Sequence, residues 1–494
     1  MSFLDTIRRF FGSAEVTFGD VNQRVAGGAV KPRGGTGSLP QSPADLPPLV
    51  VLPEYRAIQD LLDSGCPVVF VTGNAGTGKS TLIRHLREST TKQTVVLAPT
   101  GIAALQVGGA TIHSFFHFPP TIRPESGVKP GGDRNLYRSL ELLIIDEISM
   151  VRCDLLDAID SFLRKQRRTK LPFGGVQLLL VGDLFQLGPV TPTHEADVLR
   201  AMGYLSRYFF SAECMRATRV FPAELTNVFR QTDGAFIDML NLVRTADSVE
   251  RVTEDLNARC FETLPPARDI TLTSTNAQAD GINRIELERL MPAERLYVGK
   301  TEGTFIHDKD KLPSPMDLRL KVGARVMFTK NGIHWVNGSL GIVRGMDEGS
   351  VRVEMVTDAK GTVCTVPPAT WGKYRYEFDS VAGTIVPRKT GSYTQIPLML
   401  AWAVTIHKSQ GRTLDRVLVD LGQGAFEFGQ AYVALSRCRS IEGLRLARPL
   451  RTTDIKCHPM VKDFYAQLRP LLDSFGAEVD RALCANMNET PPVV

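Results

Sequence analysis

The stretch that decides the fold is Gly73-Asn74-Ala75-Gly76-Thr77-Gly78-Lys79-Ser80-Thr81, which follows the apolar run at 67–71. It matches the pattern G-x-x-x-x-G-K-[ST] in its required context of a strand, a glycine-rich turn and an amphipathic helix. Glycines let successive backbone N–H groups converge on one point, where the following helix adds its positive end. The sequence therefore predicts a phosphate loop that binds a nucleotide.

The side chains of this loop have separate predicted roles. Lys79 would reach the β- and γ-phosphates as a point charge, and the Ser80 hydroxyl would ligate Mg²⁺. A glycine-rich turn without a ligand is the alternative, which the full pattern and both flanks disfavour. The residues expected to contact ATP are Gly73, Ala75, Gly76, Thr77, Gly78, Lys79, Ser80 and Thr81.

Two further apolar strands are predicted to end in polar residues. The strand at 142–145 runs into Asp146 and Glu147, and the strand at 176–181 is followed by Gln186. We expect Asp146 to hold Mg²⁺, Glu147 to activate the attacking water and Gln186 to sense the γ-phosphate. The alternative for the two acids is that they cap the next helix. In an open parallel sheet these strand ends share one edge, where ligands bind.

Bulk composition limits the class of protein without choosing a partner. The chain has 494 residues, 43% hydrophobic and 22% charged, and we expect about three folded units. No apolar run is long enough to span a membrane, so a cytoplasmic location is predicted, or a nuclear or mitochondrial one in a eukaryote. Eight cysteines without a C-x-x-C pair argue against zinc and disulfides. A net charge of +5 is compatible with nucleic acid.

Composition also divides the chain. Residues 1–49 are predicted to be a flexible segment and linker, whose N-terminal helix is a possible docking site for a protein partner. The first α/β domain is expected at 50–206, with a small insertion at about 117–137. The second is expected at 207–321 and 399–452, interrupted at 322–398 by short alternating strands that predict a small β-barrel. A C-terminal helix and tail, at 453–494, is expected to be peripheral to the chemistry.

Two further groups of residues are ambiguous from their chemistry alone. The small, hydroxyl and aromatic residues near Thr100 and from His113 to Phe115 suit a surface for a nucleic acid backbone, but a packed loop with a core histidine is equally compatible. Arg230 and Arg437 lie outside the first domain. Each could supply charge to a transition state from a closing partner domain, or could be an ordinary surface or ion-pair arginine.

The motifs together resemble superfamily 1 helicases, and more closely the petite-integration-frequency branch related to RecD. The resemblance covers about residues 50–465 and is carried by APTGIAA at 98–104, DEISMV at 146–151 and TIHKSQGRT at 405–413. It implies two RecA-like domains with an SH3-like insertion in the second, and ATP-driven 5′ to 3′ movement on single-stranded DNA. It also implies unwinding of duplex or structured DNA in genome maintenance.

The resemblance assigns roles residue by residue. It makes Arg230 and Arg437 the arginines that complete catalysis and adds Gly411 to the nucleotide contacts. The residues that it implies for DNA are Thr100, Gly101, His113, Ser114, Phe115, Thr405, His407 and Lys408. The expected partners are single-stranded and forked DNA, and the protein is expected to be a monomer.

Two departures and two rival functions accompany this prediction. The glutamine that the family uses to read adenine has no counterpart in register, since Gln59 comes a few residues late, and Gly188 replaces a family proline. A phosphate-loop ATPase that remodels protein or protein–DNA complexes is one rival, and a DNA-binding scaffold switched by nucleotide is the other. A transporter ATPase and a GTPase are disfavoured because L-S-G-G-Q and N-K-x-D are absent.

Overall fold

The computed structural model describes residues 51–119, 131–231, 233–261, 270–307, 312–356 and 361–488. The expected N-terminal helix and linker, and most of the expected insertion near 117–137, lie outside these residues. Within the described ranges, no helix combines the length and apolar character that a membrane span requires.

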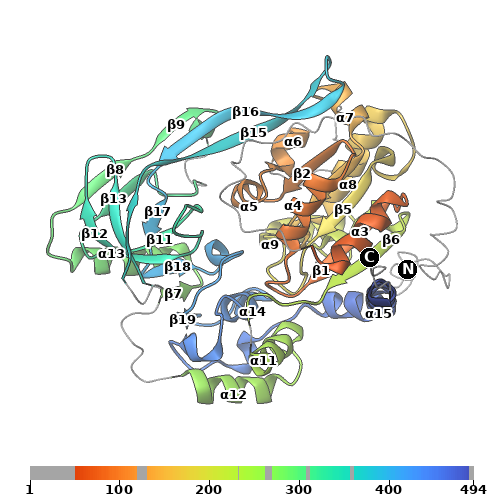
Figure 1. Ribbon diagram of the computed structural model, residues 1–494. Helices are drawn as coiled ribbons and strands as arrows, with labels where there is room; N and C mark the ends of the chain where they lie inside the picture. Colours follow the sequence, from red (N-terminus) through yellow and green to blue (C-terminus); the bar gives the residue numbers. More distant parts are fainter. Residues whose placement is uncertain are drawn as a thin grey trace, which may run out of the picture.

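The first unit is built on a six-stranded parallel sheet with the order β3-β2-β4-β5-β1-β6 (Figure 1). Its strands are nearly continuous apolar runs because both faces are covered. Alternate residues pack into two separate cores, one with α3 and α4 and the other with α6, α7 and α8. The strands are β1 (Val68–Gly73), β2 (Thr94–Ala98), β3 (Ala110–Thr111), β4 (Leu142–Ile145), β5 (Gln177–Val181) and β6 (Val220–Leu225).

Helices alternate with the strands along the first unit, as parallel pairing requires. Three further helical segments, α5, α9 and α10, complete it. The helices are α3 (Pro53–Asp63), α4 (Lys79–Ser89), α5 (Gly101–Gln106), α6 (Ile112–Phe116), α7 (Arg134–Ser139), α8 (Cys153–Arg167), α9 (Thr193–Ala201) and α10 (Glu213–Arg216).

Two segments belong to the first unit although the sequence placed them elsewhere. The strand β6 pairs in parallel with β1, so the expected start of the second unit at residue 207 is too early. The C-terminal helix α15 (Pro459–Asn488) buries Phe464 and Leu468 in the first unit's core. Both errors have one cause: sheet pairing and helix docking join segments that are distant in sequence.

The second unit has its own four-stranded parallel sheet, with the order β18-β7-β19-β20. Its core is separate from those of the first unit. The strands are β7 (Ile270–Thr273), β18 (Ala403–Thr405), β19 (Val417–Asp420) and β20 (Leu444–Leu446), and the helices are α11 (Gly234–Thr245), α12 (Val249–Cys260), α13 (Asn276–Glu288) and α14 (Gln430–Leu435). The protein therefore contains two RecA-like units.

Antiparallel strands interrupt the second unit, as the sequence predicted, but they begin at residue 295 and not at the expected 322. The reason is that β8 pairs with β10, and β9 pairs with β16, which lies more than 80 residues later. Five of them form a sheet with the order β14-β13-β12-β11-β17, while β10 pairs with β8, and β15, β16 and β9 form a third group. The strands are β8 (Arg295–Val298), β9 (Lys300–Gly303), β10 (Asp317–Leu320), β11 (Arg325–Phe328), β12 (Leu340–Met346), β13 (Val351–Met355), β14 (Val363–Val366), β15 (Ala369–Asp379), β16 (Thr384–Gln395) and β17 (Leu398–Leu400). The closed SH3-like barrel stays a prediction.

Two further features of this insertion are not evident from the sequence. The apolar run at 398–404, which by itself predicts one strand, is two strands, because β17 pairs with β11 of the insertion and β18 pairs with β7 of the second unit. The long hairpin β15–β16 leaves the insertion and reaches the first unit (Figure 1). There Tyr376 packs on Phe115, and the backbone N–H of Ile385 donates to Gln93. The insertion therefore bridges the two RecA-like units.

Candidate nucleotide site between the two units

The phosphate loop has the predicted strand, turn and helix context, joining β1 to α4. Gly76 and Gly78 have φ values of 86° and 88°, in the left-handed region that favours glycine. A Cβ on Gly76 would lie 2.5 Å from the Cβ of Arg230, so this glycine also permits a close approach. The loop is therefore shaped by its own conformation and by Arg230.

Both units hold the loop in place. The backbone N–H of Ala75 donates to the Tyr432 hydroxyl at 3.1 Å, and the side-chain amide of Asn74 donates to Asn241 at 2.8 Å. Tyr432 lies on α14 and Asn241 on α11, both in the second unit. From the first unit, the Tyr55 hydroxyl donates to the carbonyl of Gly78 at 2.9 Å. The loop is thus part of the seam between the units.

Lys79 lies at the start of α4 with its ammonium turned onto the loop. Its Nζ donates to the carbonyls of Gly73 and Asn74, each at 2.8 Å. Desolvation lowers the pKa of Lys79, while the carboxylates of Asp183, Glu147 and Asp146 act in the opposite direction. The amine is therefore close to three acids of the first unit, at the place where nucleotide phosphates are predicted to bind.

The predicted acid pair follows β4. The Asp146 carboxylate is buried and accepts a hydrogen bond from the backbone N–H of Glu147 at 2.9 Å. Burial, followed by the neighbouring Glu147, raises the pKa of Asp146 to about 7. Burial also raises the pKa of Glu147, whose φ of 50° is uncommon for a residue with a side chain. Two desolvated carboxylates would be relieved by a bound cation, and the Asp146 oxygens and Ser80 hydroxyl are ligands that suit Mg²⁺.

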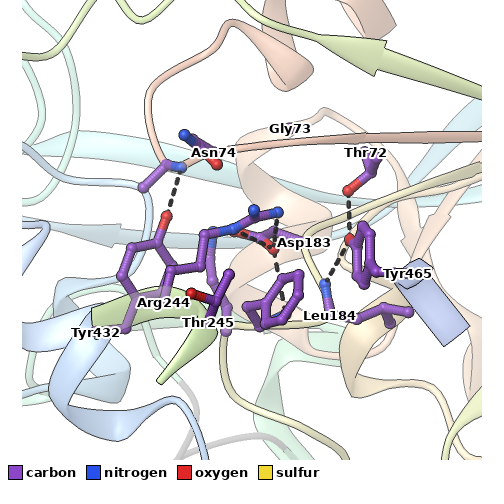
Figure 2. Close-up of polar contacts among 12 residues, drawn as sticks. Thr72, Gly73, Asn74, Asp183, Leu184, Arg244, Thr245, Tyr432 and Tyr465 are labelled. Atoms are coloured by element: carbon purple, nitrogen blue, oxygen red, sulfur yellow. Dashed lines mark hydrogen bonds and ion pairs between the residues drawn. The ribbon is translucent and has the colours of Figure 1, made fainter. Parts of the chain in front are cut away.

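Gln186 contacts a buried polar network that both units share. Figure 2 shows Asp183, Arg244 and Tyr465 of this network. Asp183 accepts from the backbone N–H of Phe185 at 3.2 Å and from the Gln186 side chain at 3.4 Å. Arg244 of α11 donates to the same carboxylate at 3.0–3.2 Å. Burial lowers the pKa of Arg244, but Asp183, Tyr465 and Tyr432 together outweigh this effect, so the net shift is upward.

The C-terminal helix completes this network, contrary to the expectation that it is peripheral. The Tyr465 hydroxyl lies 2.5 Å from that of Thr72, the residue before the phosphate loop, and accepts from the backbone N–H of Leu184 at 3.4 Å. Its ring stacks on Phe185 with the centroids 4.4 Å apart. Helix α15 therefore packs directly against the segment that carries Gln186.

The two arginines singled out from the sequence lie next to each other in the second unit. Arg230 donates to the Thr413 hydroxyl at 3.0 Å and to the Ser436 carbonyl at 3.2 Å. Arg437 is fully buried and donates to the Val433 carbonyl at 3.0 Å. Burial and the neighbouring Arg230 hold the pKa of Arg437 well below its usual range, and Glu147 acts in the opposite direction. The arginines thus lie across the seam from the acids.

The predicted DNA residues divide into two groups. Thr100 caps α5 by accepting from the backbone N–H of Ala103 at 3.2 Å, and Thr405 accepts from that of Lys408 at 3.3 Å. Ser114 and Lys408 are exposed, whereas Gly101, His113 and His407 are half-buried. Phe115 is 5% exposed and packs on Phe116, Tyr137 and Tyr376. The Phe115 ring is therefore part of the core in this structure, and its contact with DNA stays a prediction.

The structure also shows the surroundings of Gly411, Gln59 and Gly188, the remaining residues that the sequence comparison with the helicase family singled out. A Cβ on Gly411 would lie 3.2 Å from the Gln106 side chain of α5, so its contact with the nucleotide stays a prediction. Gln59 accepts from Ser89 at the far end of α4 from the phosphate loop, which leaves adenine selectivity unassigned. A Cβ on Gly188 would lie 3.0 Å from the Tyr208 ring, which explains why this chain has glycine there.

Sequence reasoning did not single out four residues that contact the loop or its neighbours. Tyr55, Asn241, Arg244 and Tyr465 lie on helices α3, α11 and α15, where their spacing resembles that of ordinary amphipathic helices. A buried arginine on the apolar helix α11 is the one unusual feature that could have pointed to a partner acid. Their partners are between 23 and 393 residues away, so only the fold reveals these contacts.

The fold and the site together define a class of protein. Two RecA-like units meet at one phosphate loop, with an acid pair on one side and two arginines on the other. This arrangement is typical of a P-loop ATPase with a composite site. A family model described as "PIF1-like helicase" matches residues 55–254.

Relatives and solved structures extend the match beyond that segment. "ATP-dependent DNA helicase PIF1" of Danio rerio is 36% identical over 85% of this chain, which corresponds to 66% of its own length. "ATP-dependent DNA helicase Pif1" of Bdellovibrio bacteriovorus is 34% identical over 85% of this chain and 92% of its own. The chain therefore belongs to the PIF1-like helicase family, and its matched part spans just under two thirds of the zebrafish relative.

Two crystal structures of Pif1 from Bacteroides are also similar. The unliganded protein is 36% identical, with a TM-score of 0.78 over 85% of this chain and 98% of that one. The complex with ADP-AlF3 and single-stranded DNA is also 36% identical, with a TM-score of 0.62 over 86% and 98%. The overall similarity is thus higher for the unliganded protein than for the complex with single-stranded DNA.

Proposed function

We propose that this protein is an ATP-dependent DNA helicase that moves 5′ to 3′ on single-stranded DNA and unwinds duplex or structured DNA. The observation that carries the proposal is the composite site, in which Lys79 and the acid pair of one unit meet Arg230 and Arg437 of the other. Membership of the PIF1-like helicase family and a relative solved with ADP-AlF3 and single-stranded DNA support it.

The proposed chemistry assigns one task to each residue. The loop amides and Lys79 bind the phosphates of ATP, Glu147 orients and deprotonates the attacking water, and Gln186 contacts the γ-phosphate. Arg230 and Arg437 neutralise charge that develops in the transition state. When Mg²⁺ is bound, Ser80 and Asp146 would hold it, and it would neutralise charge on the β- and γ-phosphates.

Movement follows in this proposal from closure and opening of the seam. Tyr432 and Asn241 of the second unit already contact the phosphate loop, so a change at the nucleotide reaches α14 and α11 directly. Thr100 of the first unit and Thr405 of the second would grip the DNA backbone in turn. An exchange of grip during each ATP cycle gives a net step along the strand.

The proposal includes the setting of the protein. Forked and single-stranded DNA are the proposed substrates, in replication, repair or recombination, and the proposed active form is a monomer. The location would be that of the chromosome, which is the cytoplasm in a bacterium or phage and the nucleus or mitochondrion in a eukaryote.

ATP turnover with and without single-stranded DNA tests the proposal, together with unwinding of partial duplexes that carry a 5′ or a 3′ tail. We expect DNA-stimulated turnover and unwinding of the 5′-tailed substrate. ATP turnover at the same rate with and without DNA would instead favour the protein-remodelling ATPase. DNA binding without any ATP turnover would favour the DNA-binding scaffold that nucleotide switches.

A further inference from the structure

A buried ion pair joins the two RecA-like units beside the candidate site. Arg244, near the end of α11, presents Nε and Nη2 to both oxygens of Asp183 at 3.0–3.2 Å. The exposed fractions of the two side chains are 7% and 0%. Figure 2 shows the guanidinium pointing at the carboxylate from the second unit. Such a two-pronged contact fixes the orientation of the carboxylate as well as its charge.

Asp183 in turn holds the segment that carries Gln186 through hydrogen bonds. Its backbone carbonyl accepts from the N–H of Gln186 at 3.0 Å, and its carboxylate accepts from the Gln186 side chain and the Phe185 N–H. The Arg244 guanidinium also lies over the Phe185 ring, 4.3 Å from its centroid. Arg244 therefore holds the turn from residue 183 to residue 186 by charge and by stacking.

Helix α11 links this contact to the other catalytic groups. Arg230 precedes the helix, and Asn241 on the same helix accepts from Asn74 of the phosphate loop. A shift of α11 relative to the first unit would therefore move the contacts of Arg244 and Asn241 together.

Stability alone is a weak explanation for the pair. A buried ion pair contributes little net stability relative to well-packed apolar residues, because desolvation of both charges offsets their attraction. The pair also has a second consequence that an apolar contact would lack, since it leaves the amide of Gln186 in a defined direction.

We propose that Arg244 is a positioning residue for ATP hydrolysis, which orients Gln186 through Asp183 only while α11 of the second unit is docked on the first. This inference rests on the proposed ATPase and deepens it, because it names the contact that makes the sensor of one unit depend on the other. Arg244 does not touch the nucleotide in this scheme.

The test compares Arg244→Lys, Arg244→Gln and the wild-type chain at saturating single-stranded oligothymidylate. Lysine keeps the charge but loses the two-pronged contact, so we expect kcat to fall about tenfold, and by up to about a hundredfold for glutamine. KM for ATP and the affinity for a fluorescent ADP analogue should change less than about threefold, because phosphate binding does not depend on Arg244.

Repeating the test in the Gln186→Ala variant distinguishes a role of Arg244 in positioning Gln186 from a role in holding the fold together. If Arg244 acts through Gln186, then Arg244→Lys should cost almost nothing further in kcat once Gln186→Ala is present. The matched control is Arg207→Gln, which breaks another ion pair between the units, Arg207 to Glu427 at 2.8 Å, away from Asp183. Its kcat at the same saturating oligothymidylate should stay within about twofold of wild type.

Three outcomes would overturn the inference: an unchanged kcat in Arg244→Lys and Arg244→Gln, a kcat loss of equal size in the Gln186→Ala background, or an equal loss in Arg207→Gln. A wild-type chain without ATP turnover would refute the proposed function itself, so the two failures are distinguishable. Thermal melting of each variant shows whether it is folded, and Arg244→Lys keeps the test valid if Arg244→Gln is not.

Discussion

The two parallel sheets of this protein have similar topology and opposite chemistry at their strand ends. In the first unit, β1 is followed by a glycine-rich loop, and α4 begins without a side-chain cap. In the second, β7 is followed by Thr275, whose hydroxyl caps α13 by accepting from Gln278 at 3.3 Å. The first helix start is thus left open for an oxyanion, while the second is already satisfied by the protein.

The charged groups follow the same division. The first unit contributes the acids Asp146 and Glu147, and the second contributes the arginines Arg230 and Arg437. In the proposed mechanism, the first unit therefore holds the nucleotide and the second completes its surroundings. The comparison shows that two units of similar fold need not each contain a site. Here each unit supplies different groups to one site, so catalysis would depend on how the two units pack together.

The largest effect is expected where the difference between the units is greatest, at the phosphate loop. Changing Lys79→Ala should abolish ATP hydrolysis, because it removes the amine that contacts the Gly73 and Asn74 carbonyls and would reach the phosphates. Turnover is measured with a coupled assay, and single-stranded DNA binding without nucleotide is the control for folding. If the variant kept its full turnover, the assignment of the nucleotide site to this loop would be wrong.

The next largest effect tests the contribution of the second unit. Arg437→Ala should lower kcat by about 10³ while sparing nucleotide binding, because the guanidinium acts on transition-state charge. The side chain is fully buried, so thermal melting must accompany the assay, and Arg437→Lys should recover part of the rate. An unchanged kcat would contradict a role of Arg437 in catalysis and would leave it only a structural role, through its hydrogen bonds to backbone carbonyls.

A third prediction tests the close contact between the units at Gly429, where there is no room for the methyl group of alanine. Gly429 has a φ of 75°, and a Cβ there would lie 2.3 Å from the carbonyl of Phe185. Gly429→Ala should therefore push α14 from the Gln186 segment and lower kcat by tenfold to about a hundredfold. Gly203→Ala is the matched control, since Gly203 has a φ of 88° with open space around it. Equal effects of the two changes would mean that backbone strain alone is responsible.

A fourth prediction concerns the unpaired acids of the first unit. The raised pKa of Asp146, about 7, means that the folded state disfavours its ionised form. This group's contribution to stability is therefore fully present below its ordinary pKa and is lost as pH rises to about 7. Without nucleotide and Mg²⁺, Asp146→Asn should be more stable than wild type by about 2 kcal/mol at pH 8, with a smaller difference at pH 5. Denaturant unfolding at both pH values measures this, and a pH-independent difference would contradict it.

The smallest effect is expected where the two units are most alike. Thr100 and Thr405 each cap a short helical turn at a strand end, one in each unit. Replacing either with alanine should weaken single-stranded DNA binding by about fivefold, since a lost cap costs about 1 kcal/mol. Serine keeps the hydroxyl and should restore binding. Fluorescence anisotropy with an oligonucleotide measures this, and loss in only one unit would show that the grips are unequal.

Local sequence was enough to predict the chemistry of the first unit. The pattern from Gly73 to Thr81 and the acids after 142–145 have their meaning within a few residues, because glycine geometry and strand ends are local properties. Phe115 shows the limit of this reasoning. Its aromatic ring suits stacking on DNA or packing in a core, and the neighbours that decide, Tyr137 and Tyr376, come 22 or more residues later.

The division into units could be predicted less well. Alternation of short strands revealed the insertion, but nothing local in Val220–Leu225 indicates that β6 pairs with β1. Likewise, the run at 398–404 reads as one strand, although its two ends hydrogen-bond to different sheets. Strand propensity reports that a segment is extended, and only pairing decides where it belongs.

The sequence by itself determined the phosphate loop and predicted the acid pair for its nucleotide, because those groups are defined by short-range spacing at the ends of neighbouring strands. Only the tertiary structure decided that Arg244 meets Asp183, that Tyr465 meets Thr72, and that the second unit reaches the phosphate loop through Tyr432. The physical reason is that burial and hydrogen bonding between distant segments depend on how whole units pack, and that packing is a property of the assembled chain.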